Sequence, residues 1–199
     1  MTRQEVQALN HPQKGSKIKV GPITELKDIK TIKTMLTDKP LDYALFVVGI
    51  NTALRASDLL NLKVYQVKDL KPGNELEIVE RKTRKYRRLT LNKAVIEAIQ
   101  GLLASKVYDD MDYLFKGQRG VLTVPTVNAK VKSWCAALHL RGNFGSHTLR
   151  KTWGYHQRVT FKVDIPTIMQ AFGHSHQRET LIYLCIQPEE IQNMYQNEL

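Results

Sequence analysis

The sequence of 199 residues is poor in cysteine and has no long apolar run. The two cysteines, Cys135 and Cys185, lack the spacing of metal ligands, and no set of cysteines and histidines has that spacing. The sequence also has no cluster of acidic residues that could bind a metal ion instead. The common metal-binding patterns are therefore excluded, and the scarcity of cysteine suits a reducing compartment.

Membrane-spanning segments are also missing. The longest apolar stretch, LDYALFVVGI at 41–50, is interrupted by Asp42 and has about half the length that a transmembrane helix needs. It predicts a buried helix instead. The N-terminal residues MTRQEVQALNHPQKGSK contain no apolar signal segment. We therefore expect a cytoplasmic protein that does not associate with membranes.

Positive charge is abundant. Thirty Lys and Arg residues stand against 19 Asp and Glu, which gives a formal net charge of +11. Such a balance favours a polyanionic partner, nucleic acid before a membrane surface. A hydrophobic content of 42% is enough for one main domain. Residues 1–22 are polar, basic and interrupted by proline and glycine, so we expect a flexible arm there.

The apolar pattern over residues 23–199 predicts a mostly helical α+β fold. Two segments, NELEIVERK and YRRLTLN, alternate apolar and polar residues and predict an antiparallel β-hairpin. Elsewhere apolar residues recur at helical spacing. The expected helices cover about 23–36, 41–48, 54–62, 95–103, 127–138, 147–159, 165–171 and 176–184, with a last amphipathic segment that carries Ile191, Met194 and Tyr195.

The run ERKTRKYRR at 80–88 has one acid followed by six cations, and it falls at the tip of the predicted hairpin. No Gly or Asn lies between Thr83 and Lys85, so we expect a longer loop and not a two-residue turn. A run of this kind is most often a solvated face or a patch that holds a polyanion. The run alone does not show whether one of its cations takes part in chemistry.

Several polar residues suit phosphate chemistry, although each has an ordinary alternative. His147 and Arg150 are three apart on a predicted helix, so both face one patch, where an arginine fork and a proton carrier would suit a phosphate. Taken alone, such a pair more often has a structural role, in a salt bridge or a core position. Arg55 could simply pair with Asp58, and Tyr183, among leucines and isoleucine, could be a core aromatic.

Taken in order, these segments resemble the tyrosine recombinase, or phage integrase, family. TALRASDL matches T-G-L-R-x-S-E-L, and HTLRKT matches H-x-L-R. FGHSHQRETLIY matches L-G-H-x-x-x-x-x-T-x-x-Y, and KTRKYRR matches the hairpin pattern K-T-x-x-x-x-R. The sequence departs from these patterns with Ala53 for Gly, Asp58 for Glu, Phe172 for Leu, and Lys151 where many members carry His.

The resemblance implies that residues 23–199 form the family's catalytic domain, with a small antiparallel sheet. Members normally carry a helical core-binding domain in front, where we expect only the short arm of residues 1–22. The resemblance also implies partners: double-stranded DNA and further protomers on it, as a tetrameric synapse. The last helix then packs either on its own domain or on a neighbouring protomer. Association with the nucleoid follows from DNA as the partner.

The implied chemistry is attack of Tyr183 on a DNA phosphate, giving a 3′-phosphotyrosyl bond and a free 5′-hydroxyl. Bond energy is conserved, so no cofactor is required, and the lack of metal-ligand patterns predicts metal-independent catalysis. A phenol with a pKa of about 10 benefits from a base. The implied catalytic set is Arg55 and Arg150 for phosphate charge, His147 as the base, His174 as a phosphate hydrogen-bond donor, Lys82 as the acid for the leaving oxygen, and Tyr183.

The other cations are expected to contact the DNA backbone without reading sequence. Two alternatives remain beside a recombinase. One is a catalytically idle DNA-binding regulator or accessory module with the same fold, and the other is a relaxing topoisomerase with the same chemistry. The expected DNA contacts are Arg81, Arg84, Lys85, Arg87, Arg88 and Lys151.

Overall fold

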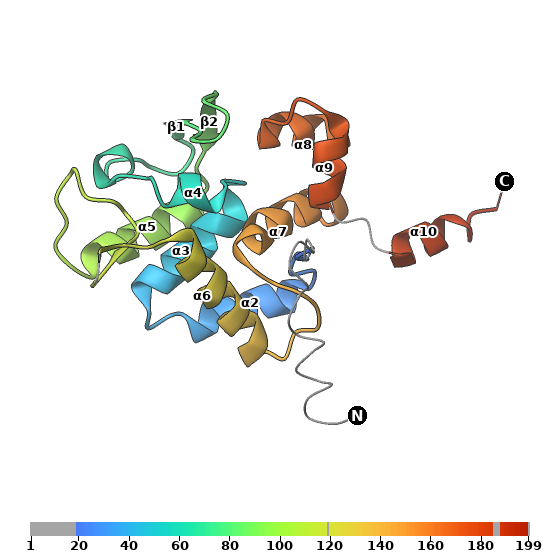
Figure 1. Ribbon diagram of the computed structural model, residues 1–199, viewed down its shortest axis with the longest axis horizontal. Coiled ribbons are helices and arrows are strands. Elements are labelled where there is room, and N and C mark those ends of the chain that lie inside the picture. Colours follow the sequence, from blue (N-terminus) through green and yellow to red (C-terminus); the bar gives the residue numbers. More distant parts are fainter. Residues whose placement is uncertain (1–18, 119, 185–187, 199) are drawn as a thin grey trace, which may run out of the picture.

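The computed structural model describes residues 19–118, 120–184 and 188–198 (Figure 1). Most of the predicted arm of residues 1–22 lies outside this range. The elements in chain order are α2 (Leu26–Met35), α3 (Pro40–Asn51), α4 (Ala56–Leu59), the 3-10 turn η1 (Val64–Gln66), β1 (Glu75–Val79), β2 (Tyr86–Thr90), α5 (Lys93–Ala104), β3 (Lys116–Gly117), β4 (Gly120–Val121), α6 (Val124–Ala137), α7 (Ser146–Val159), α8 (Ile165–Phe172), α9 (Gln177–Leu184) and α10 (Pro188–Met194).

This architecture confirms the predicted mostly helical α+β fold. The helices lie where the apolar periodicity indicated, apart from α4, which is shorter than the segment 54–62. The short pair β3 and β4 was not predicted, because two-residue strands have no alternating pattern to detect. Among the described residues, none of the helices is long and apolar enough to cross a membrane.

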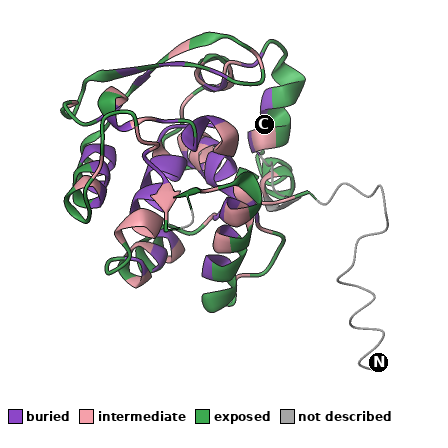
Figure 2. Ribbon diagram, turned by 60° about the vertical axis from the view of Figure 1, so that its left-hand side comes forward, coloured by how far each residue is buried: buried purple, intermediate pink, exposed green. Residues whose placement is uncertain are grey.

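The main hydrophobic core lies among α2, α3, α5 and α6, with one face of the hairpin closing it (Figure 2). The predicted helix 41–48 is the central α3, which is buried almost all round and packs against both α5 and α7. Phe46 meets Trp134 of α6 edge to face, with ring centroids 5.7 Å apart. These contacts fix α7 against the core, and α7 carries two of the predicted site residues.

A second, smaller apolar cluster holds α8 and α9 against α7. It is built on the buried residues Ile168, Phe172 and Leu184. Helix α7 approaches this cluster closely at Gly154, where an added Cβ would lie 2.6 Å from Cζ of Phe172. Because a methyl group would not fit there, glycine allows Phe172 of α8 to pack against α7. Helices α8 and α9, which flank His174 and carry Tyr183, therefore pack on α7, which carries His147 and Arg150.

The hairpin also has the predicted form. Strands β1 and β2 pair antiparallel from Glu75 opposite Thr90 to Val79 opposite Tyr86. The connection is a longer loop, closed by hydrogen bonds from the Glu80 amide to the Lys85 carbonyl and from the Arg84 amide to the Glu80 carbonyl, both of 2.9 Å. The loop thus carries four of the six cations of the run, and strand β2 carries the other two, Arg87 and Arg88.

Helix α10 lies apart from the body on the C-terminal side of α9 (Figure 1). Its start is held by an ion pair in which both Nη atoms of Arg158, at the end of α7, contact the Glu190 carboxylate, one of them at 2.7 Å. The predicted stripe of Ile191, Met194 and Tyr195 is exposed.

Candidate active site

The six residues of the predicted catalytic set come from five separate places in the chain. Arg55 precedes α4, Lys82 lies in the hairpin loop, and His147 and Arg150 lie on α7. His174 follows α8, and Tyr183 is near the end of α9. Direct contacts join four of them, His147, Arg150, His174 and Tyr183, at the junction between the main core and the smaller cluster.

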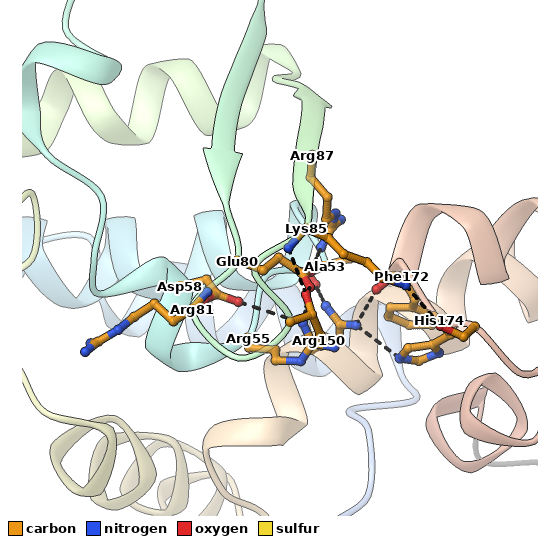
Figure 3. Close-up of polar contacts among 12 residues, drawn as sticks. Ala53, Arg55, Asp58, Glu80, Arg81, Lys85, Arg87, Arg150, Phe172 and His174 are labelled. Atoms are coloured by element: carbon orange, nitrogen blue, oxygen red, sulfur yellow. Dashed lines mark hydrogen bonds and ion pairs between the residues drawn. The ribbon is translucent and has the colours of Figure 1, made fainter.

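Arg150 is the centre of the site and is only 1% exposed. One Nη donates to the carbonyl of Ala53, and the other donates to the carbonyl of Phe172 at 2.8 Å (Figure 3). Burial, reinforced by the charge of Arg55, lowers the pKa of Arg150 to about 10, so the guanidinium stays charged near neutral pH. Its Nε has no hydrogen-bond partner among the described residues. A buried cation with a free donor is suited to an incoming anion.

His174 lies against Arg150, with Nε2 3.2 Å from an Arg150 Nη. Because a guanidinium can only donate, Nε2 accepts this hydrogen bond and the proton sits on Nδ1, which lies 3.0 Å from Oγ1 of Thr180. Burial and then the charge of Arg150 lower the pKa of His174 to about 4, which keeps the ring neutral. In this arrangement His174 orients Arg150, and its predicted role as a phosphate donor stays a prediction.

The tyrosine hydroxyl and a histidine meet directly in the site. Oη of Tyr183 lies 3.2 Å from Nδ1 of His147, and the Tyr183 ring lies 5.2 Å from the Arg150 guanidinium. Partial burial lowers the pKa of His147, and the charges of Arg150, Lys151, Arg55 and Lys82 lower it further. A neutral imidazole is therefore placed to accept the phenol proton. The influence of Lys82 also puts the hairpin loop close to His147.

Arg55 has a partner that the sequence analysis did not identify. Its Nη1 lies 2.7 Å from Oε2 of Glu80, and 3.9 Å from the expected partner, Asp58. Glu80 is completely buried and also accepts hydrogen bonds from Thr83 at 2.6 Å and from Arg87 at 2.9 Å. Burial alone raises the pKa of Glu80, but these hydrogen bonds outweigh it and lower the pKa to about 2. The only signal in the sequence was one acid in front of six cations.

The predicted DNA contacts differ in their surroundings. Arg87 is mostly buried, and its other Nη donates to the Ala171 carbonyl at 2.6 Å, so its guanidinium is used within the protein. Lys151 is 8% exposed, with its ammonium 5.9 Å from the centre of the Tyr183 ring. Lys85 donates to Ser175 at 3.0 Å across to the start of α9. The exposed members are Arg81, Arg84, Lys85 and Arg88.

Asp58, on α4, connects the segment that carries Arg55 to the hairpin loop. It is buried, and its Oδ1 accepts a hydrogen bond of 2.9 Å from the backbone amide of Arg81, whose side chain points away from Arg150 (Figure 3). With Glu80 it gives the loop two carboxylate anchors beneath an otherwise cationic surface. The site thus combines a phenol, a neutral imidazole and a cluster of guanidinium groups, which suits nucleophilic attack on a phosphodiester.

Comparison with known proteins decides the family. The model of the phage integrase family matches residues 23–190, which is most of the chain. The chain belongs to the phage integrase family. The probable integrase/recombinase YoeC of Bacillus subtilis (strain 168) is 34% identical over 178 residues, covering 88% of this chain and 95% of YoeC.

Two longer recombinases are also similar. The tyrosine recombinase XerC of Caldanaerobacter subterraneus subsp. tengcongensis is 30% identical over 158 residues, which cover 77% of this chain and 43% of XerC. The structure of the XerH site-specific recombinase, bound to palindromic difH substrate in a post-cleavage complex, superposes with a TM-score of 0.73 at 20% identity. That match covers 92% of this chain and 53% of XerH. The chain thus spans about half the length of XerC and XerH.

Proposed function

We propose that this chain cuts and rejoins DNA strands through a 3′-phosphotyrosyl intermediate, as a site-specific recombinase or integrase. The observation that carries the proposal is the contact between Tyr183 and His147 beside the buried guanidinium of Arg150. A DNA-binding module without catalysis would have no use for a nucleophile paired with a neutral base. Membership of the phage integrase family supports the same activity.

In the proposed cleavage step, Oη of Tyr183 attacks phosphorus while its proton passes to His147. The bond from phosphorus to the 5′-oxygen breaks, and the ammonium of Lys82 gives that oxygen a proton. Arg55 and Arg150 hold the non-bridging oxygens, whose negative charge grows in the transition state. Rejoining is the reverse reaction, with a 5′-hydroxyl from a partner strand as the nucleophile, so protons and bonds balance over the cycle.

The proposed partners are double-stranded DNA and further copies of the chain on it. The net charge of +11 and the exposed cations of the hairpin support DNA binding. XerH is bound to its difH substrate in the related structure. We propose a tetrameric synapse on DNA, and therefore a cytoplasmic protein associated with the nucleoid. Residues 23–199 would act as the catalytic domain and residues 1–22 as a basic arm.

The experiment is covalent trapping on a suicide substrate, a duplex nicked so that the released 5′-end diffuses away. The wild-type chain is expected to form an adduct that survives denaturing electrophoresis, both in magnesium and in excess EDTA. Tyr183→Phe removes only the nucleophilic oxygen, so DNA binding should remain while the adduct disappears. Tyr155→Phe is the matched control, because it removes a hydroxyl from α7, and it should form the adduct normally.

Two results would reject this proposal. An adduct that persists in Tyr183→Phe would assign the nucleophile to another residue. DNA binding with no adduct in the wild-type chain, on substrates of several sequences, would favour the accessory DNA-binding module.

A further inference from the structure

Glu80 is the only fully buried carboxylate that contacts two guanidinium groups in the described part of the chain. It directly follows strand β1, at the point where the hairpin loop begins. A carboxylate without solvent requires strong partners, because its desolvation is costly. Glu80 has three such partners, Arg55, Thr83 and Arg87, and through them it contacts three different parts of the proposed site.

The first partner is Arg55. Oε2 of Glu80 forms an ion pair with Nη1 of Arg55 at 2.7 Å, and Figure 3 shows Arg55 beside Arg150. A guanidinium has five N–H donors in one plane. The ion pair at Nη1 therefore draws one end of the group toward Glu80, and the group still has Nη2 and Nε as donors for a phosphate. Glu80 is placed to orient the fork of Arg55 before DNA binds.

The second partner is the hairpin loop that carries Lys82. The same Oε2 accepts a hydrogen bond of 2.6 Å from the hydroxyl of Thr83, next to Lys82. The backbone of Glu80 also closes the loop at both of its ends, through Lys85 and Arg84. Lys82 itself is exposed, so the loop conformation determines where its ammonium lies. Through Thr83, the Glu80 side chain holds that conformation.

The third partner is Arg87, which extends the connection to α8. Oε1 of Glu80 accepts from Arg87 at 2.9 Å, and Arg87 donates onward to the Ala171 carbonyl. The next carbonyl, that of Phe172, accepts from Arg150. We propose that Glu80 is a positioning residue for strand cleavage, which sets Arg55 and the Lys82 loop against Arg150. This inference rests on the strand-transfer function proposed above.

The test compares two matched variants. Glu80→Gln keeps the shape of the side chain but removes the charge that both guanidinium groups face. Glu77→Gln makes the same change on the same hairpin, where Glu77 pairs with Arg88 at 3.0 Å in solvent. We measure single-turnover cleavage of a suicide substrate at saturating protein, and DNA affinity separately. Glu80→Gln should slow cleavage by roughly 100-fold, as expected when catalytic groups move by about 1 Å, with affinity within about threefold. Glu77→Gln should cleave normally.

A second substrate separates positioning from general damage. Sulfur in place of the bridging 5′-oxygen leaves without a proton, so it removes the need for the Lys82 acid. Glu80→Gln should recover part of its loss on this substrate, because its effect through Arg55 remains. Thr83→Val removes the hydrogen bond from Thr83 to Glu80 and the long one, of 3.4 Å, that Thr83 accepts from the Lys85 amide, both of which hold the loop. We therefore expect a smaller loss that the sulfur substrate restores completely. General misfolding would lower cleavage of both substrates equally.

Each outcome is decisive. Cleavage by Glu80→Gln within twofold of wild type would overturn the proposal, and so would equal losses of Glu80→Gln on the oxygen and sulfur substrates. If Glu80→Gln does not fold, Thr83→Val decides: a loss restored by sulfur supports positioning, and unchanged cleavage refutes it. The wild-type chain is assayed before any variant. If it forms no adduct, the result rejects the proposed function and does not bear on the role of Glu80.

Discussion

Glu80 should also make the stability of the domain depend on pH in a way that one substitution can isolate. Its pKa is lowered from the ordinary value of 4.5 to about 2 in the folded protein, the effect of Thr83, Arg87 and Arg55 outweighing burial. At about 1.4 kcal/mol per pKa unit, this corresponds to about 3 kcal/mol of stability near pH 7. Glu80→Gln should therefore lower the free energy of unfolding by about that amount.

The sign follows from the direction of the pKa change. Because the folded state holds the carboxylate more tightly than the unfolded state, the stabilisation is complete above about pH 5 and is lost as the pH falls toward 2. At pH 3, about 1.5 kcal/mol should remain by the same linkage. Groups away from Glu80 titrate alike in wild type and Glu80→Gln, so their contributions cancel in the difference; His174 and Arg150, whose pKa values the charge of Glu80 raises, are the exceptions.

Urea unfolding followed by far-ultraviolet circular dichroism, at pH 7 and at pH 3, measures this difference. The gap between wild type and Glu80→Gln should shrink from about 3 to about 1.5 kcal/mol. Glu77→Gln is the control, since its exposed pair contributes less than about 1 kcal/mol at either pH. If wild type and Glu80→Gln differ in free energy of unfolding by the same amount at both pH values, Glu80 is not stabilised as a buried carboxylate. An equal loss of stability in Glu77→Gln would lead to the same conclusion.

Three further predictions concern the catalytic groups. Because its surroundings lower the pKa of His147, the cleavage rate should stay level from pH 8 to below 6.5 and fall only in more acidic buffer; a midpoint above 6.5 in a rate–pH profile would contradict this. Lys82→Ala should be restored by a bridging 5′-sulfur and Lys85→Ala should not, whereas restoration of Lys85→Ala alone would move the acid to that position. Thr180→Val should slow cleavage about 10-fold, roughly the effect of losing about 1.4 kcal/mol from one buried hydrogen bond, and a wild-type rate would show that the His174 tautomer does not matter.

The sequence predicted the fold where local patterns determine it. The helices that became α2, α3, α5, α6 and α7 each have an apolar stripe or run, and the hairpin has strict alternation. The expected loop at its tip was also correct, since no residue between Thr83 and Lys85 favours a tight turn. What could not be predicted were elements with too few residues to show a period, such as the pair β3 and β4, and the early end of α4 at Leu59.

The site was predictable only as a set of residue types. Motifs spaced along the chain gave Arg55, His147, Arg150 and Tyr183, and the structure brings these four together. Their internal partners depend on packing between segments far apart in sequence, so no local pattern revealed them. The contact between Arg87 and Ala171, 84 positions apart, is one example, and it gives a structural role to a residue whose DNA contact stays a prediction. Within a run of charged residues, the sequence alone does not distinguish an arginine that is buried in the fold from one that is exposed.

Ala53 illustrates how a departure from the family pattern can leave the site intact. The pattern has Gly at this position, and the backbone of Ala53 has φ 54°, in the left-handed region that glycine favours. An L-residue there costs about 1–2 kcal/mol, and burying the methyl group, which is part of the smaller apolar cluster, returns about 0.8 kcal/mol. The site uses the carbonyl of this residue, which accepts a hydrogen bond from Arg150. Since alanine tolerates this backbone conformation at a small net cost, the carbonyl stays in place for the arginine that it supports.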